Sequence, residues 1–298
     1  MKLLALTVLV HEGPIARAYL GMLRASGYRI ARLVLMLQKR DPGSQRPLAP
    51  WLPNTVRRPL LRRVQDLRMN YWPRELLRRH HAVCVPWLKA LATTYAFDPV
   101  VFDSLTERPN YARYADQVVE VVTDGLADPA LAHHLGSLPG HTAVLFTGGG
   151  MVPATLLALP HCRFIHIHPG VLPQVRGADG LLWSILLRGR PGATIFYMSP
   201  GLDSGDVIAS SEFEIPPLPE GFTAFDTQTA YRLIYAFVDP VMRALMLLRV
   251  PQRGDADLFA LPRTRQAAHE GTTFHFMNDA VRRFSVERLQ SLSALGQL

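Results

Sequence analysis

Two histidines, His166 and His168, end the short apolar run of residues 162–168 (CRFIHIH). Residues two positions apart in a strand point to the same side, so the two imidazoles would face one space while Ile165 and Ile167 pack on the other. A single histidine at a strand end is more often structural than catalytic. A same-face pair at the carboxyl end of a central strand favours function, because ligands collect there and imidazole exchanges protons near neutral pH.

A stiff turn follows the pair, since Pro169 and Pro173 enclose three residues that begin with Gly170. Proline fixes the backbone, and we expect the glycine to take a turn geometry closed to other residues. Such rigidity would hold a reactive side chain in place. The other interpretation is an ordinary proline-rich loop.

The second candidate is the segment 199–207 (SPGLDSGDV), which sets Asp203 and Asp206 among glycines and serines. An aspartate on a loop beside a histidine can orient the ring and stabilise its protonated form. The sequence lacks the twelve-residue calcium-loop pattern and any partner cluster of carboxylates, so we predict no metal site. Taken by itself, this loop is typical of a solvated turn.

The third candidate is the glycine-rich segment 146–153 (FTGGGMVP). It has neither the lysine of a phosphate-binding loop nor the glycine spacing of a dinucleotide fingerprint, so a nucleotide site is disfavoured. Its backbone amides and carbonyls could instead recognise a flat heterocycle.

Apolar runs alternate with segments of helical spacing, which predicts an α/β protein with a mostly parallel sheet and helices on both faces. We expect one unit over 1–215 with a helical insertion at about 41–99. A mainly helical C-terminal extension, 216–298, would pack on the core, with a kink or break at Pro240. The expected strands are residues 3–10, 31–37, 116–123, 142–146, 162–168, 192–198 and, at an edge, 207–215.

Composition narrows the class of protein. Two cysteines, Cys84 and Cys162, lack metal-binding spacing, and no apolar run is long enough to span a bilayer, so we expect a cytoplasmic protein without membrane association. The net charge of +8 makes nucleic acid or an acidic small molecule a candidate partner. Residues 57–79 are rich in arginine with two acidic residues, which favours a surface helix pair over an RNA-binding arm.

The segment 166–177 (HIHPGVLPQVRG), followed by 192–208 (GATIFYMSPGLDSGDVI), closely resembles the formyltransferase superfamily. That superfamily includes methionyl-tRNA, glycinamide ribonucleotide and sugar-amine formyltransferases. The resemblance covers about residues 3–211 without the insertion. It implies a Rossmann-like sheet, the cofactor 10-formyltetrahydrofolate, and transfer of a formyl group to an amine.

The family's catalytic set is an asparagine, a histidine and an aspartate. By resemblance, His168 takes the histidine position and Asp203 the aspartate position, while His166 stands where the family has asparagine. A neutral His166 could donate one N–H to an oxyanion, and a protonated ring would donate more strongly but add a pH dependence. Three outcomes remain open: a replacement donor, a branch with altered substrate or rate, or a protein that binds without transferring.

The resemblance also implies the cofactor contacts. Gly150, Met151 and Val152 match a segment whose backbone recognises the pterin ring, and the opposite wall would be the loop of Ser199, Pro200, Gly201 and Leu202. The alternative is that Met151 and Val152 are core residues.

The acceptor is less constrained. Residues 217–298 lack the strand and turn signals of the barrel domain that methionyl-tRNA formyltransferase carries, so we expect a small, anionic amine such as a modified sugar or amino acid. Transfer to a tRNA-linked amine, a catalytically impaired folate-binding or partner protein, and a homodimer remain alternatives. The segment 271–283 (GTTFHFMNDAVRR) would be a folded-back strand that covers the core or a lid over the acceptor pocket.

Overall fold

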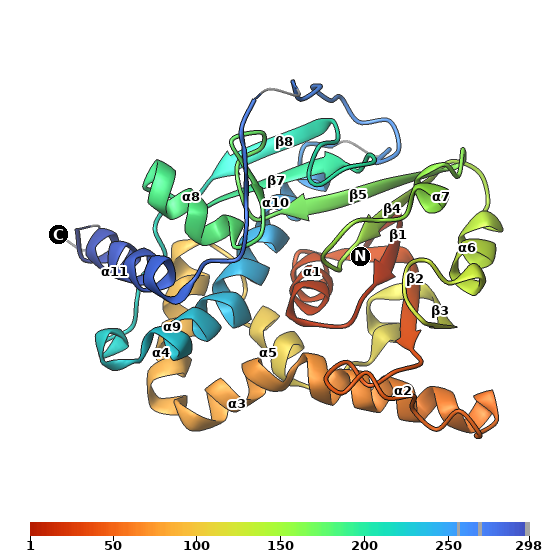
Figure 1. Ribbon diagram of the computed structural model, residues 1–298, viewed down its shortest axis with the longest axis horizontal. Helices are drawn as coiled ribbons and strands as arrows, with labels where there is room; N and C mark the ends of the chain where they lie inside the picture. The colour runs from red at the N-terminus through yellow and green to blue at the C-terminus, as the bar shows by residue number, and fades with distance from the viewer. Residues whose placement is uncertain (255–256, 268–269, 296–298) are drawn as a thin grey trace.

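A seven-stranded sheet runs through the molecule in the order β3-β2-β1-β4-β5-β7-β8 (Figure 1). The computed structural model describes residues 1–254, 257–267 and 270–295. The first five strands of the chain are parallel, and the last two pair antiparallel, so the predicted mostly parallel sheet with β8 at an edge is confirmed. These strands are β1 (Lys2–Val10), β2 (Tyr28–Gln38), β3 (Ala115–Thr123), β4 (Thr142–Phe146), β5 (Cys162–His168), β7 (Gly192–Tyr197) and β8 (Val207–Glu212).

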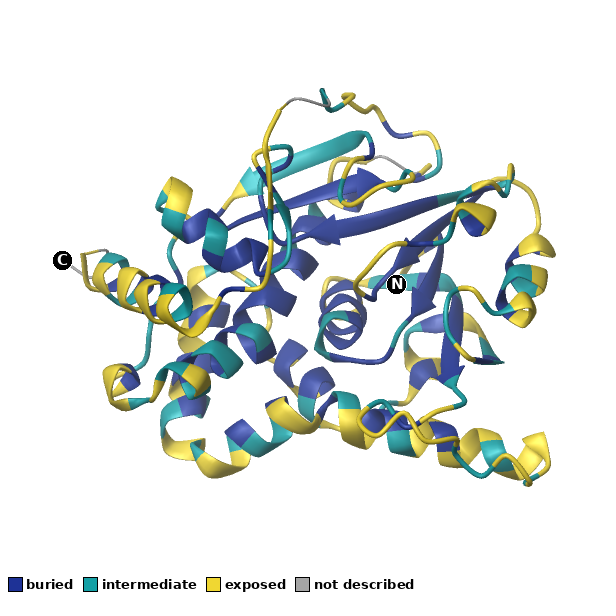
Figure 2. Ribbon diagram, in the orientation of Figure 1, coloured by how far each residue is buried: buried dark blue, intermediate teal, exposed yellow. Residues whose placement is uncertain are grey.

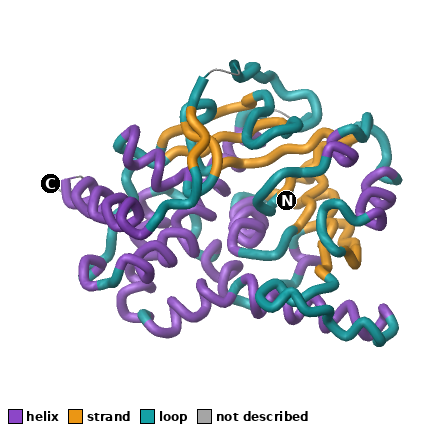
Figure 3. The backbone as a smooth tube through the Cα atoms, in the orientation of Figure 1, coloured by secondary structure: helices purple, strands orange, loops and turns teal. Residues whose placement is uncertain are grey.

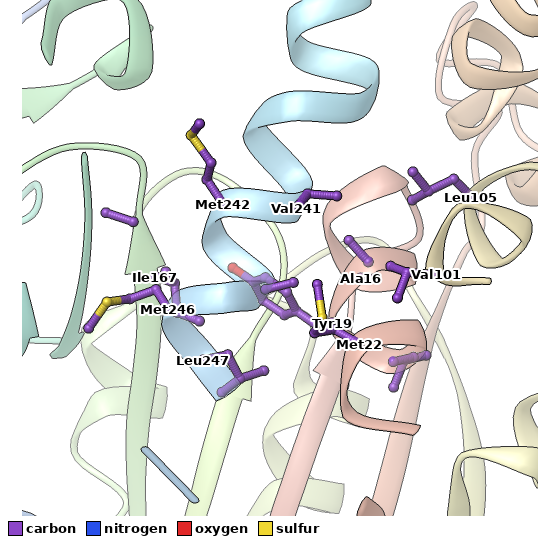
Figure 4. Close-up of a cluster of buried hydrophobic side chains, with 14 of the residues drawn as sticks. Ala16, Tyr19, Met22, Val101, Leu105, Ile167, Val241, Met242, Met246 and Leu247 are labelled. Atoms are coloured by element: carbon purple, nitrogen blue, oxygen red, sulfur yellow. The ribbon is translucent and has the colours of Figure 1, made fainter. Parts of the chain in front are cut away.

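Helices cover both faces of the sheet, as predicted. Ile165 and Ile167 pack in one buried cluster with helices α1 and α10, and Figure 4 shows Ile167 beside these helices. Phe164 packs in a second cluster with α6 and α7. Because strand side chains alternate, His166 and His168 fall on the side of Phe164. These helices are α1 (Pro14–Ala25), α6 (Pro129–Gly136), α7 (Ala154–Leu157) and α10 (Asp239–Gln252).

The predicted helical insertion lies between β2 and β3 and forms an outer layer whose solvent side is exposed (Figure 2). Most arginines of the basic stretch are engaged within the chain, for example Arg62 with Glu120 and Arg68 with Asp41. The predicted surface helix pair is therefore confirmed. The helices are α2 (Asn54–Met69), α3 (Tyr71–Arg79), α4 (His81–Thr94) and α5 (Val101–Thr106), with a 3-10 turn η1 (Tyr111–Arg113) before β3.

A buried ion network fastens the insertion to the end of β1. Arg17 of α1 lies 2.7 Å from a carboxylate oxygen of Glu12 and 2.7 Å from one of Asp66 in α2. Asn70 and Tyr111 also donate hydrogen bonds to Glu12. All three charged side chains are buried, so each depends on the others for the interactions that water would otherwise supply.

The predicted long helix after residue 223 is broken one turn before Pro240. Residues Ile234–Val238 (η3) form a π-helical turn between α9 (Thr227–Leu233) and α10. Proline lacks the N–H that would continue the regular ladder and its ring crowds the preceding turn, so the backbone widens there. A 3-10 turn, η2 (Phe222–Ala224), precedes α9, and α11 (Asp279–Leu295) closes the described part of the chain.

A second, two-stranded sheet joins the C-terminal region to the segment behind the histidines (Figure 3). Strand β9 (Thr272–Phe274) pairs in parallel with β6 (Val175–Gly177), just before α8 (Gly180–Arg188). The folded-back strand predicted for 271–283 is thus present. The division of the chain at residue 215 stays a prediction. Among the described residues, no helix combines the length and apolar character needed to cross a bilayer.

Arg17→Met tests the ion network. The change leaves the buried Glu12 carboxylate without its cation, while Asp66 keeps Arg74, so we expect the free energy of unfolding, measured by urea denaturation, to fall by about 3 kcal/mol. Arg188→Met is the matched control, because Arg188 pairs with Glu212 at the surface and its removal should cost less than about 1 kcal/mol. Equal losses in the two variants would contradict a role of the network in holding the insertion.

Candidate active site

The carboxyl end of β5 opens into a cavity of about 690 Å³. His166, His168 and Asp203 line it together, as do Gly149 and Gly150 from the glycine-rich segment. Strand β7 runs antiparallel to β5 and ends beside Ile165, and the loop that follows returns toward the carboxyl end of β5, where Asp203 meets His168. The structure thus brings together the three side chains that the sequence selected. Further walls come from α9, α10 and the segment after β9.

The His168 ring is held at both nitrogens. Nε2 lies 2.8 Å from the carbonyl oxygen of Val175, which can only accept, so Nε2 carries a proton. Nδ1 lies 3.3 Å from Oδ2 of Asp203, and that oxygen also accepts the Gly177 N–H at 2.8 Å. Burial lowers the pKa of His168, while the Asp203 carboxylate works in the opposite direction. A further proton would therefore be held between Nδ1 and Asp203.

Gly170 makes room for this ring, and the reason differs from the one expected. Its φ is not positive, so the turn geometry predicted for it is wrong. A Cβ at this position would lie 2.9 Å from Nε2 of His168 and 3.0 Å from the carbonyl oxygen of Val175. At Gly180 a Cβ would lie 2.2 Å from the carbonyl oxygen of Pro169 and 3.1 Å from the same nitrogen of His168. Close approach of other groups, and not backbone conformation, explains both glycines.

The His166 ring is also held by a backbone carbonyl, but its proton lies on the other ring nitrogen. Its Nδ1 lies 3.0 Å from the carbonyl oxygen of Phe146 at the end of β4, so the ring proton is on Nδ1. Burial, with the positive charge of Arg243 next in size, lowers the pKa of His166 to about 4. The ring is therefore neutral near pH 7, and Nε2 presents a lone pair. In this arrangement Nε2 of His166 can accept a hydrogen bond, whereas the side-chain N–H of an asparagine would donate one.

A buried ion pair that the sequence analysis missed stands beside the histidines. Arg243 of α10 donates through Nη1 to the carbonyl oxygen of Ile167 at 3.0 Å, and its Nε lies 3.0 Å from Asp239. Both side chains line the cavity. The available signal was an acidic and a basic residue four apart within an otherwise apolar helix, which places the pair on one face.

The sequence analysis also missed a hydrogen-bonded group formed by Asp179, which directly precedes α8, and Tyr231 of α9. Asp179 accepts hydrogen bonds from the hydroxyl of Tyr231 at 2.6 Å and from the backbone N–H of Met277 at 2.8 Å. Burial, and then the bond to Asp179, raises the pKa of Tyr231. The hydroxyl of Tyr235 is buried and has no hydrogen-bond partner among the described residues. Asp179 and both tyrosines line the cavity.

The family profile described as "Formyl transferase" matches residues 98–227, which include all three predicted catalytic side chains. Residues 98–227 of this chain are therefore similar to the formyl transferase family. A methionyl-tRNA formyltransferase of Syntrophus aciditrophicus is 35% identical over 138 residues, 46% of this chain and 42% of that protein. A cytosolic 10-formyltetrahydrofolate dehydrogenase of Xenopus tropicalis is 29% identical over 151 residues, 50% of this chain and 15% of that protein.

The matched segment thus spans less than half the length of either relative. Among solved structures, a sugar N-formyltransferase of a Shewanella species is 10% identical with a TM-score of 0.43, covering 97% of this chain and 88% of that one.

The cofactor contacts implied by family resemblance divide into three groups in the structure. Gly150 and Leu202 line the cavity with the histidines. Ser199 and Pro200 instead line a separate hollow of about 730 Å³ on the other side of their loop, and Gly201 is exposed. The third group does not reach the cavity: Met151 is 66% exposed, and Val152 is 5% exposed because it packs in the second apolar cluster.

The described residues offer no group of metal ligands at this cavity or elsewhere. In residues 1–254, 257–267 and 270–295, no three His, Cys, Asp or Glu side chains are grouped so that they could hold one.

His166→Asn tests the assignment of a neutral, buried imidazole. A histidine takes up a proton near its usual pKa of about 6.5 when the chain unfolds, whereas in the folded protein it does so only near 4. The unfolded state therefore binds more protons between these values, and stability falls as pH falls through this range. We expect the wild type to lose about 2 kcal/mol more than the variant between pH 7 and pH 5 in urea denaturation.

His81→Asn is the control for this measurement, since His81 is exposed at the start of α4. The control should retain the acid sensitivity of the wild type. If all three proteins lose equal stability between pH 7 and pH 5, the His166 assignment is wrong.

Proposed function

We propose that this protein transfers a formyl group from 10-formyltetrahydrofolate to the primary amine of a small molecule. The observation that carries the proposal is the distance of 3.3 Å between Nδ1 of His168 and Oδ2 of Asp203, with His166 lining the same cavity. This histidine–aspartate pair occupies the positions that the family resemblance implies. Similarity to the formyl transferase family supports the reaction class, and the name of the Xenopus relative supports the folate cofactor.

The cavity suits a folate in size and in the character of its edge. Its volume of about 690 Å³ is within the usual range of small-molecule sites. Gly150 has a φ of +88°, and a Cβ there would meet nothing within 4 Å, so a flat ring could approach its backbone closely. Leu202, 41% exposed, supplies an apolar contact on the same cavity. We propose Gly150 and Leu202 as cofactor contacts from the cavity side.

When bound, the cofactor supplies the formyl carbon: a C–N bond to the acceptor amine forms, the C–N bond to folate breaks, and one proton moves from the amine to the folate nitrogen. We assign His166 Nε2 as the group that accepts the amine proton. A pKa near 4 makes it a weak base. Bond formation to the carbonyl carbon uses the lone pair of the amine and makes its N–H more acidic, which favours transfer of the proton to this base.

The negative charge that develops on an oxygen in this cavity needs a donor or a cation. Neither histidine offers a free N–H, since Nδ1 of His166 and Nε2 of His168 both point at backbone carbonyls. Arg243 lines the same cavity, and its positive charge lowers the pKa of both rings. We therefore assign the stabilisation of this charge to Arg243.

Small-molecule amines are favoured over tRNA as the acceptor. The arginines of α2 and α3, which would be the obvious RNA contacts, are largely engaged in intramolecular pairs such as Arg74 with Asp66. The anionic acceptor expected from net charge has little support, since the only arginine lining the described cavity, Arg243, is already paired with Asp239.

Asp203→Asn tests the histidine–aspartate pair. The neutral amide cannot stabilise a further proton held on Nδ1 of His168, so we expect kcat for formyl transfer to fall by about 10²-fold or more. Asp206→Asn is the matched control on the same loop, because Asp206 pairs with Arg263 and lines the other hollow. Transfer of the formyl group would be followed by mass spectrometry of the acceptor. Similar rates in the two variants would contradict the assignment.

His166→Phe and His166→Asn separate transfer from simple binding. Both substitutions remove the proton acceptor, so turnover should fall in both variants. Asparagine should retain more turnover than phenylalanine, because its amide supplies the N–H that the family resemblance implies at this position. A protein that only binds would instead take up a formyl-folate analogue without forming product in the wild type and in both variants. Calorimetry with that analogue, run beside the turnover assay, distinguishes the two cases.

A further inference from the structure

The walls of the cavity are negatively charged. Asp179, Asp203 and Asp239 line it, and Arg243 is the only Lys or Arg among the described residues that do. With both histidines neutral, these four side chains carry a net charge of −2. Arg243 pairs with Asp239, donates to the carbonyl of Ile167 and is the cation assigned above to the reacting oxygen, so no further cation in the described lining is left for an anionic group on the acceptor. A phosphate or carboxylate on the acceptor would meet uncompensated repulsion in a partly desolvated space.

The remaining lining is largely aromatic. Tyr231 and Tyr235 lie with ring centroids 4.6 Å apart, and Phe274 and Phe276 come from the strand and segment that fold back over the site. Phe276 lines the cavity and is 78% exposed, so its ring is accessible to a ligand bound there. Aromatic faces attract both apolar groups and ammonium ions.

The segment that carries these phenylalanines is fixed in place. The Ala178 N–H donates to the carbonyl of Phe274 at 3.0 Å, and Phe274 stacks on Trp183 with centroids 4.5 Å apart. A Cβ on Gly177 would lie 2.1 Å from the same carbonyl oxygen, so the two backbones are in direct contact. The aromatic wall is therefore built into the fold, and Phe276 projects from an anchored segment.

One polar group in this wall has no use within the protein. The Tyr235 hydroxyl is buried without a hydrogen-bond partner among the described residues, an arrangement that costs free energy unless a ligand supplies the partner. It belongs to the π-helical turn, a feature often associated with functional sites.

We propose that the acceptor is a primary amine on an apolar or aromatic skeleton, without phosphate or carboxylate groups. The inference rests on the proposed function, because it describes the second substrate of that site. Negative walls attract the amine as an ammonium ion, Phe274 and Phe276 pack against its skeleton, and the Tyr235 hydroxyl bonds a polar atom on it. The positive charge of the protein is no obstacle, because it is concentrated elsewhere.

The hollow of about 730 Å³ behind the Asp203 loop shows where that charge lies. Arg163, Arg176, Arg263 and Arg265 line it, against the single carboxylate of Asp206. An anionic compound would be drawn there and not to the histidines. Any test must therefore separate binding in the two places, which a substitution confined to one of them achieves.

Tyramine and tyramine O-phosphate are suitable probes, because they share one skeleton and differ by the phosphate. Calorimetric titration of the full chain without cofactor should give a dissociation constant at least about tenfold lower for tyramine. Phe276→Ala should weaken tyramine binding by about tenfold. Since this side chain is exposed, the variant should fold, and Phe284→Ala, 62% exposed on α11 and outside the cavity, is the matched control.

Binding of tyramine O-phosphate that matches or exceeds tyramine binding and is weakened by Phe276→Ala would overturn the inference. So would failure of tyramine to bind at 10 mM. If tyramine O-phosphate binds and Phe276→Ala does not change that binding, the compound is bound in the arginine-lined hollow. The inference is then judged on tyramine, which must bind and must bind more weakly to Phe276→Ala. Turnover is read separately: tyramine binding without formyl transfer refutes the proposed function alone, whereas efficient transfer to the phosphorylated amine refutes this inference alone.

Discussion

Two backbone carbonyls determine what the histidines of this site can do. The oxygen of Phe146 fixes the proton of His166 on Nδ1, and the oxygen of Val175 fixes that of His168 on Nε2. Each carbonyl therefore selects a tautomer, and the two selections differ. His166 turns a lone pair to the cavity, while His168 turns one to Asp203. Two side chains of one type, on one face of one strand, thereby acquire separate functions.

The chain reversal after β7 brings Asp203 to His168, so that this histidine can act together with a carboxylate. At Gly205 a Cβ would lie 1.7 Å from the carbonyl oxygen of Tyr197, so the loop can close only with glycine there. Asp203 takes a left-handed φ of 50°, uncommon outside glycine, and Gln266 donates to its carbonyl and to that of Gly205. A residue far along the chain thus holds the loop that brings the carboxylate to His168.

The sequence was sufficient wherever local pattern decides structure. Alternation along residues 162–168 predicted which side chains of β5 share a face, and the spaced motifs selected His166, His168 and Asp203 for one site. It was insufficient where distant segments meet. The Arg243–Asp239 pair and Asp179 with Tyr231 enter the cavity only because α8, α9 and α10 pack around β5, and no local spacing encodes that packing.

Tertiary contacts also decide two further residues. Val152 was selected by family resemblance, with a place in the core as the alternative, and its side chain packs among the apolar side chains under α7. Gly170 was explained by backbone freedom, yet the His168 ring and the Val175 carbonyl are what exclude a side chain there. In both cases the residue was identified correctly as special or apolar, and only tertiary contacts could supply the reason.

The replacement of asparagine by His166 consequently affects more than one position. An amide at 166 would supply an N–H to the cavity, and the imidazole held by Phe146 supplies a lone pair in its place. A site that keeps transfer chemistry must then obtain positive polarisation from another group. Arg243 meets that need, and its charge is also one reason that His166 stays neutral. The cation and the neutral imidazole are therefore interdependent: removing the charge of Arg243 would raise the pKa of His166, and protonating His166 would place two cations together in a buried space.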